Sequence, residues 1–436
     1  MSKAIITGLI FYLATTFNLL NAQSPDVPTP APAQKGRIYL TNATIHLGNG
    51  QVMENGTIGF ENGKIVFLEK NINFKTDQTG KIIDCTGKHI YPGIIAMNTI
   101  LGLSEIEAVR ATNDYAETGA YNPDVRAIVA YNTDSRVTPT VRSNGVLYAQ
   151  IMPQEGWVSG TSAVVNLDAW NWEDAAVKTA DGVVMSWPTM FYFKGWWAEP
   201  QGIQPNKDYD KQVADLKEFL KEAKSYCEEP THEKANLRFE SMRGVFNKTE
   251  NLYVRVDHIK EIEHAIAFAE ELGVKIVLVG AKESYMIADE LAQKKIPVIL
   301  DKCHEVPMYE DEDVQQPYKT PAIMQKAGVL YCIGISEGFW QERNLMFEAG
   351  TAAAYGLTKE EALEAITLNP AKILGISDSI GTLEKGMVAS LIVSGGDVLD
   401  MKTSNIEYAF IDGRQIDLNN KQKALYEKFA KKYGVY

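Results

Sequence analysis

The chain has 436 residues, of which 45% are hydrophobic and 23% are charged, so it can bury a large core as one barrel or as two domains. Its formal net charge is −13. Because phosphate binding needs clustered Lys and Arg, this acidic balance argues against nucleic acid as a partner.

The first 22 residues have the composition of a secretory signal peptide. Lys3 precedes an uncharged apolar run at residues 4–20, and Ala22 offers a small residue for cleavage. An uncleaved membrane anchor is the alternative, but the run is at the short end of what spans a bilayer. We therefore expect a periplasmic or secreted protein with no integral membrane segment after cleavage. The Pro-rich leader at residues 23–36 is expected to be disordered or extended, without packing.

Residues 37–91 contain short strand-like segments separated by Asn and Gly turns, which is typical of a small β unit. The same pattern of short strand-like segments recurs at residues 376–420, where 390–393 and 406–411 are strand candidates. The sequence predicts that both ends of the chain pair into one composite β-sandwich domain. A charged helix at residues 421–436 follows, and it is expected to be a solvated amphipathic cap.

Between these β segments, residues 92–375 alternate strands with helices, the pattern of a parallel sheet with crossover helices. Their length predicts an α/β fold built on a (β/α)8 barrel, whose active site lies at the C-terminal ends of the strands. A doubly wound open sheet is the second interpretation. Strands are expected at residues 146–152, 162–167, 252–257, 275–279, 297–300 and 330–335, and helices at 261–272, 283–295, 321–326 and 358–366.

Four short segments, in this order and spacing, carry a family resemblance. They are residues 91–95 (Tyr-Pro-Gly-Ile-Ile), 347–350 (Phe-Glu-Ala-Gly), 367–371 (Thr-Leu-Asn-Pro-Ala) and 381–386 (Gly-Thr-Leu-Glu-Lys-Gly). Together they make the chain resemble the amidohydrolase superfamily, especially its branch related to imidazolonepropionase. The resemblance implies a metal-site TIM-like barrel with a composite β-sandwich domain. It also implies hydrolysis of C–N bonds in amides or cyclic amides.

The metal ligands that the resemblance implies are replaced, so the metal site is degenerate. Such a reaction needs a divalent ion that polarises the carbonyl and activates water, held by neutral His and carboxylate ligands. Ile and Gly side chains offer no ligand, and a guanidinium repels a cation. The sequence therefore predicts no metal cofactor. The residues at the family's ligand positions are Asn98, Ile100, Arg255, Gly280 and either Ser336 or Glu337.

Other polar side chains follow the predicted strands. Asp301, His304 and Glu337 are candidate catalytic groups, and with Asp257 and His258 they make a rebuilt metal site a less favoured alternative. A metal-free pocket in which Arg255 binds a small anionic ligand is the more natural interpretation. An internal ion pair of Arg255 with Asp257 or Glu337 explains the same residues equally well.

Two functions follow from these observations. The first is an exported amidohydrolase-like pseudoenzyme that binds a small anionic or amide ligand. It would act as a partner subunit, in a hetero- or homo-oligomer with an amidohydrolase relative. The alternative is an active C–N hydrolase with a non-standard or metal-free site. Pairing among Cys85, Cys227, Cys303 and Cys332 cannot be deduced from their spacing.

Overall fold

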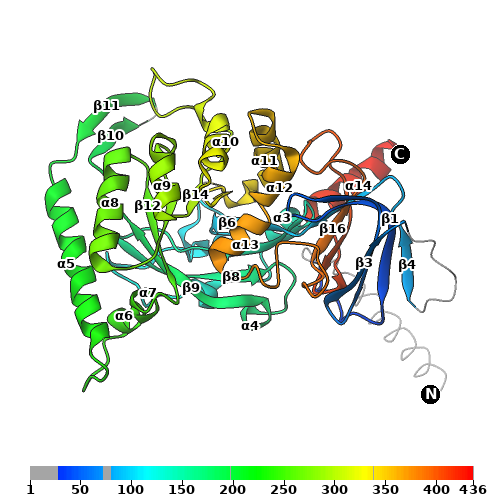
Figure 1. Ribbon diagram of the computed structural model, residues 1–436, viewed down its shortest axis with the longest axis horizontal. Helices are drawn as coiled ribbons and strands as arrows, with labels where there is room; N and C mark the ends of the chain where they lie inside the picture. Colours follow the sequence, from blue (N-terminus) through cyan, green and yellow to red (C-terminus); the bar gives the residue numbers. More distant parts are fainter. Residues whose placement is uncertain (1–27, 72–79, 197, 337, 436) are drawn as a thin grey trace, which may run out of the picture.

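The computed structural model describes residues 28–71, 80–196, 198–336 and 338–435 (Figure 1). The predicted signal peptide lies outside these residues. Within them the structure has two eight-stranded sheets and a separate hairpin, β10 (Phe191–Trp196) with β11 (Glu199–Pro205). The two sheets are called here the terminal sheet and the barrel sheet.

The terminal sheet joins the two ends of the chain. Its strand order is β18-β17-β16-β5-β1-β2-β3, with β4 paired to β1, and the antiparallel pair of β16 with β5 links the two halves. This joining of N- and C-terminal strands was predicted, whereas their description as a β-sandwich stays a prediction. The strands are β1 (Ile38–His46), β2 (Val52–Glu61), β3 (Lys64–Lys70), β4 (Lys81–Asp84), β5 (His89–Pro92), β16 (Leu391–Ser394), β17 (Ile406–Ile411) and β18 (Arg414–Gln415).

The barrel sheet has the order β15-β14-β13-β12-β9-β8-β7-β6 and is nearly closed. Its end strands approach each other, since a Cβ on Gly334, just after β15, would lie 2.9 Å from the Met97 carbonyl oxygen of β6. The strands are β6 (Ile94–Thr99), β7 (Val146–Ile151), β8 (Val158–Asn166), β9 (Ala176–Ser186), β12 (Asn251–Val256), β13 (Ile276–Gly280), β14 (Val298–Leu300) and β15 (Tyr331–Ile333).

The barrel sheet departs from a regular (β/α)8 pattern at β7, β8 and β9. These strands pair antiparallel, whereas β6–β7 and the run from β9 to β15 are parallel. The connection from β7 to β8 spans only residues 152–157, too short for a crossover helix, so the chain must turn straight back. The expectation of a uniformly parallel barrel was therefore wrong in this part of the sheet.

Helices cover the barrel sheet (Figure 1). Most of the predicted helices begin and end near the expected residues. Gly273 ends α8 in the left-handed conformation, and Thr358 caps α12 in a capping box with Glu361. The helices are α2 (Ala127–Ala130), α3 (Thr138–Arg142), α4 (Trp172–Ala175), α5 (Tyr209–Glu228), α6 (Leu237–Glu240), α7 (Arg243–Phe246), α8 (Ile259–Leu272), α9 (Ala288–Lys294), α10 (Gln316–Ala327), α11 (Leu345–Ala354), α12 (Lys359–Glu364), α13 (Leu368–Leu374) and α14 (Lys421–Tyr433), with 3-10 turns η1 (Arg110–Thr112), η2 (Ser284–Ile287) and η3 (Phe339–Asn344).

The described part of the leader packs against the folded chain, contrary to the expectation from its Pro-rich composition. The Ala31 N–H donates to Asp168 Oδ2 at 2.9 Å, and Arg414 Nη1 donates to the Ala31 carbonyl at 3.0 Å. Gln34 Nε2 donates to the Phe60 carbonyl at 2.9 Å. Extended Pro-rich chain can therefore dock when distant side chains satisfy its backbone groups.

Two further properties concern the membrane and redox predictions. None of the helices among the described residues combines the length and the apolar composition needed to cross a membrane. All four cysteines are free thiols, and Cys85, Cys303 and Cys332 are buried.

Candidate functional site

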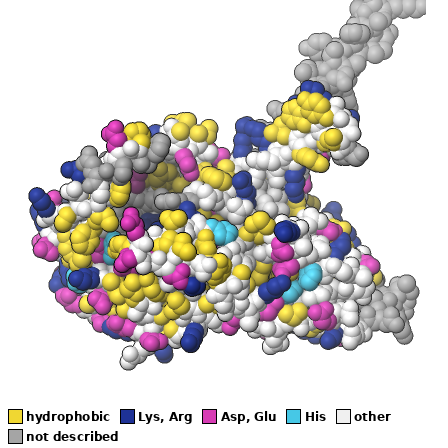
Figure 2. All heavy atoms as spheres, turned by 90° about the horizontal axis from the view of Figure 1, so that it is seen from above, with side chains coloured by type: hydrophobic (Ala, Val, Ile, Leu, Met, Phe, Trp, Pro, Cys, Tyr) yellow, Lys and Arg dark blue, Asp and Glu magenta, His cyan; other side chains and the backbone are white. Residues whose placement is uncertain are grey.

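A cavity of about 240 Å³ lies where six strands of the barrel sheet end. Figure 2 shows that the surface is hollowed on the side of the molecule that carries this sheet. The register pairs Val256 with Gly280, Gly280 with Leu300, and Leu300 with Ile333, which brings these strand ends to one level. Seven of the positions singled out in the sequence line the cavity together: Asn98, Arg255, Asp257, His258, Gly280, Asp301 and Ser336.

Arg255 and Asn98 are hydrogen-bonded to each other across the cavity. Arg255 Nη2 donates to Asn98 Oδ1 at 3.1 Å, and Arg255 Nη1 donates to the Pro153 carbonyl at 2.9 Å. Asn98 has a φ of +56°, at an irregularity in the pairing of β6 with β7. Asn tolerates this left-handed conformation better than most residues, so the local geometry favours the residue type found here.

The charge on Arg255 is not balanced by a described carboxylate. Both of its hydrogen-bond acceptors are neutral oxygens, and it forms no ion pair within the part of the chain that the structure describes. Burial lowers the pKa of Arg255 to about 10, so the guanidinium still carries its charge at neutral pH. The predicted ion pair with Asp257 is therefore wrong, while Glu337 lies outside the described residues.

Two carboxylates of the cavity are engaged elsewhere. Burial raises the pKa of Asp257, and the positive charge of Lys282 opposes that rise. Asp301 Oδ2 accepts a hydrogen bond from Ser336 Oγ at 2.6 Å, and Asp301 Oδ1 accepts from the N–H groups of Lys302 and Ser336 at 2.9 and 3.1 Å. Of the two candidate catalytic groups that the structure describes, Asp301 and His304, only Asp301 lines the cavity.

Gly280 leaves the space that Asp257 occupies. Its φ is +81°, and a Cβ at this position would lie 2.6 Å from Asp257 Oδ1. Any larger side chain would be strained by the backbone and would displace the carboxylate. A histidine at this position would need both a strained left-handed backbone and a shift of the Asp257 side chain.

The described residues do not fit the divalent ion of the resembled family. A guanidinium and a glycine stand at two of the implied ligand positions, and Asn98 Oδ1 already accepts from Arg255. Among the described residues no group of three or more His, Cys, Asp or Glu side chains is arranged to hold a metal ion.

Two predicted positions that the structure describes, His304 and Ile100, are not among the residues that line the cavity. His304 is bound to α11, with its Nδ1 2.9 Å from Glu348 Oε1 and its Nε2 2.5 Å from Thr351 Oγ1. The hydrogen bond to Glu348 raises the pKa of His304. Ile100, 8% exposed, belongs to the hydrophobic core of the barrel. The cavity therefore does not bring His304 and Asp301 together.

Several cavity residues were not predicted. Trp187 and Thr189 follow β9, a strand absent from the sequence-based expectations, and Glu261 lies in the first turn of α8. The buried carboxylate of Glu261 accepts from Thr189 Oγ1 at 3.0 Å and from the Met190 N–H at 2.5 Å. The apolar residues 183–185 were the available signal for β9, and they were too few to mark a strand on their own.

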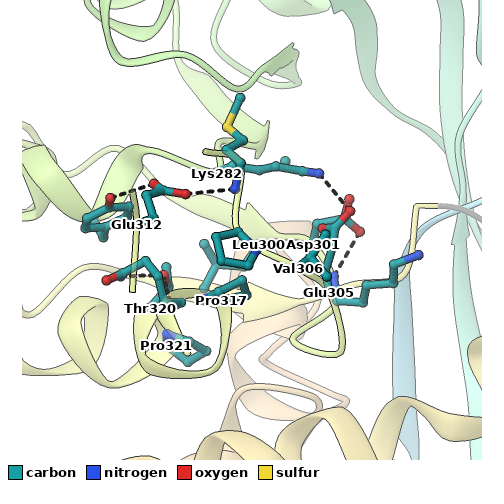
Figure 3. Close-up of a pocket in the computed structure, with 15 residues that line it drawn as sticks. Lys282, Leu300, Asp301, Glu305, Val306, Glu312, Pro317, Thr320 and Pro321 are labelled. Atoms are coloured by element: carbon teal, nitrogen blue, oxygen red, sulfur yellow. Dashed lines mark hydrogen bonds and ion pairs between the residues drawn. The ribbon is translucent and has the colours of Figure 1, made fainter. Parts of the chain in front are cut away.

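A second, smaller cavity of about 50 Å³ adjoins the first and shares Gly280 and Asp301 with it (Figure 3). Leu300, Val306 and Pro317 contribute apolar surface to it. Lys282 Nζ lies 2.9 Å from Glu305 Oε1 at its edge. This lysine is ion-paired, whereas Arg255 has no carboxylate partner among the described residues.

Comparisons with known proteins agree with this architecture. The amidohydrolase family model matches residues 325–416, and no curated protein matches the chain. An amidohydrolase from Thermotoga maritima MSB8 has 25% sequence identity and a TM-score of 0.75, covering 87% of this chain and 99% of its own.

More distant solved structures share the fold alone. Molinate hydrolase is 16% identical with a TM-score of 0.53, covering 88% of this chain and 96% of its own. A Xaa-Pro dipeptidase with bound methionine is 14% identical with a TM-score of 0.53, covering 87% of this chain and 100% of its own.

Proposed function

Because the chain belongs to the amidohydrolase superfamily, we propose that it is an exported member which binds a small anionic ligand in a metal-free cavity. The ligand's carboxylate would occupy the cavity at the strand ends of the barrel. The single observation that carries this proposal is Arg255, a charged side chain in the cavity whose described partners are neutral oxygens.

The chemistry of the guanidinium supports a carboxylate as the ligand group. Arg has five N–H donors in a planar fork, and two of them account for its described hydrogen bonds. A carboxylate can accept two of the remaining N–H groups in parallel and neutralise the buried charge. Asp257 and Asp301 compete only weakly with the ligand's carboxylate for Arg255. The positive charge of Lys282 acts on Asp257, and Asp301 accepts hydrogen bonds from Ser336 Oγ and from backbone N–H groups.

The wider role proposed here is that of a binding or partner subunit without a catalytic metal. The replaced ligand positions support this, because Arg255 supplies a positive charge where the family's ion would sit. The apolar run of residues 4–20 supports export. An amidohydrolase relative with a complete site is the proposed companion, in a hetero- or homo-oligomer.

The proposal is tested by calorimetric titration of the purified protein with acetate, N-acetyl amino acids and dipeptides. We expect Arg255→Met to weaken binding at least about tenfold, since charged hydrogen bonds contribute about 1.5–3 kcal/mol. Arg255→Lys should retain part of the affinity, because it keeps the charge but loses the fork. The matched control is Arg238→Met, which removes an exposed arginine on α6 that does not line the cavity.

Unfolding midpoints of the ligand-free variants distinguish lost binding from lost folding. Equal binding of these ligands by wild type and Arg255→Met, with both proteins folded, would contradict the proposal. So would metal analysis that finds one tightly bound zinc or manganese per chain.

The alternative function, C–N hydrolysis at a non-standard site, rests on Asp301. Its carboxylate lies in the cavity and holds Ser336 Oγ at 2.6 Å, so it could also accept a proton from a water or hydroxyl group. A screen of N-acyl amino acids, dipeptides and lactams tests it. Turnover that persists after chelation and is lost in Asp301→Asn favours hydrolysis over binding alone.

A further inference from the structure

The C-terminal helix α14 (Lys421–Tyr433) is attached to the rest of the molecule mainly by its first turn. Asn420 caps the helix by accepting from the Lys423 N–H at 2.9 Å, and its Nδ2 donates to Ser143 Oγ at 2.9 Å. Ala430 is its sole buried residue. A helix of 13 residues gains most of its stability from packing an apolar face, so this exposure needs an explanation.

An apolar face of α14 is open to solvent. Leu425, Tyr426, Phe429 and Tyr433 recur at helical spacing and are 41%, 66%, 46% and 67% exposed. The rings of Phe429 and Tyr433 stack at 6.5 Å, which makes the exposed surface continuous. Contiguous apolar surface of this kind marks a binding face.

Lysines border this face. The helix contains five lysines and one acidic residue, Glu427, in a chain whose net charge is −13. Two of the lysines lie against the aromatic rings, Lys428 at 6.0 Å from the centre of Phe429 and Lys432 at 5.1 Å from that of Tyr433. Apolar side chains and basic groups therefore form one mixed surface.

We propose that α14 binds the protein to an anionic lipid surface, lying in the plane of the headgroups. The aromatic and aliphatic side chains would enter the boundary between headgroups and acyl chains, while the lysine ammonium groups reach the lipid phosphates. A span is excluded by length, because 13 residues extend only about 20 Å and the hydrocarbon core is about 30 Å thick.

Charge favours lipid over a second copy of α14 as the occupant. Two such helices packed face to face would bring their lysines together across a symmetric interface, which is repulsive. An anionic membrane surface instead attracts each lysine. None of the described side chains of α14 lines the ligand cavity, so this inference does not rest on the proposed ligand.

The test is flotation of the full chain with phosphatidylcholine vesicles that either contain or lack about 30 mole percent phosphatidylglycerol. We expect binding to the anionic vesicles, weakened by salt. Phe429→Ser with Tyr433→Ser, and separately Lys428→Glu with Lys432→Glu, should each weaken it at least about tenfold. The matched controls are Phe193→Ser on the exposed hairpin and Lys260→Glu with Lys402→Glu, all at exposed positions outside α14.

All variants share the same N-terminal segment, so the apolar run of residues 4–20 contributes equally, and circular dichroism checks that each one folds. Binding of the α14 variants at wild-type strength, equal binding to neutral vesicles, or no binding at all overturns the proposal. A dimer in light scattering that is lost in Phe429→Ser with Tyr433→Ser, without vesicle binding, would assign the face to a second copy instead.

Discussion

Gly280 combines two constraints at the end of β13. Its φ of +81° is a conformation that L-residues adopt only with strain, and the space beside its Cα is taken by Asp257 Oδ1. Gly273, which ends α8, has a similar φ of +71°, but apart from its chain neighbours no described atom lies within 4 Å of the point that a Cβ would occupy there. Comparing substitutions at the two glycines therefore distinguishes the effect of backbone strain from that of crowding.

We expect Gly280→Ala and Gly273→Ala each to lower the free energy of unfolding by about 1–2 kcal/mol, the cost of the left-handed backbone. Gly280→Ala alone should also weaken binding of the proposed anionic ligand, because its methyl group displaces the Asp257 carboxylate within the cavity. Urea denaturation and titration of the same preparations measure both effects. A Gly280→Ala protein with wild-type stability and affinity would contradict this account.

At the scale of elements, His304 ties the loop after β14 to α11. The Glu348 carboxylate accepts from the His304 backbone N–H at 2.8 Å and lies 2.9 Å from its Nδ1. This contact raises the pKa of His304, so the folded state holds the proton more tightly than the unfolded chain. The resulting stabilisation is complete below the unfolded pKa of about 6.5 and is lost as pH rises through the raised folded value.

We therefore expect the stability advantage of wild type over His304→Gln to be larger at pH 6 than at pH 8.5. Because the imidazole is 40% exposed, solvent screening keeps the difference small. Denaturation at both pH values measures it, and Glu348→Gln should remove the same pH dependence. If the stability advantage of wild type instead increased with pH, the contact of His304 with Glu348 would not stabilise the protonated imidazole.

The ends of several barrel strands could be predicted because these strands are apolar runs that alternate with clearly marked helices. Arg255 and Gly280 were located in this way, and they do converge. Strand β9 could not be predicted, since Lys178 and Asp181 give its sequence the polarity of a loop. In the fold, Asp181 is fully buried, pairs with Lys178 at 2.9 Å and accepts from the Tyr253 hydroxyl at 2.5 Å. The Tyr253 hydroxyl, 72 residues away in sequence, is a partner that the local sequence of β9 does not reveal.

At the scale of the whole molecule, Asp168 joins three separate parts of the chain. Its fully buried carboxylate lies 2.6 Å from Arg142 Nη1 in the barrel domain and 2.8 Å from Arg414 Nη1 in the terminal sheet. It also accepts from the Ala31 N–H of the leader at 2.9 Å. Partners 26, 246 and 137 residues away cannot be inferred from composition, which is why the leader's docking could not be predicted.

We expect Asp168→Asn to lower the free energy of unfolding by about 3–5 kcal/mol, because it leaves two largely buried guanidinium groups without their counter-charge. Urea denaturation measures the loss. Asp311→Asn, at an exposed position, is the control and should change stability by less than about 0.5 kcal/mol. A loss no larger than that of the control would show that the arginines find other partners.

The pairing of β16 with β5 also has a consequence for the order of folding. When the chain emerges from the ribosome N-terminus first, β5 precedes β16 by nearly 300 residues, and β1 precedes it by more. Until then one edge of the first strands lacks the partner that completes its hydrogen bonding. Closing so large a loop slows folding, and the exposed edge can pair wrongly in the meantime. Premature termination near the C-terminus would therefore damage the first domain to be synthesised.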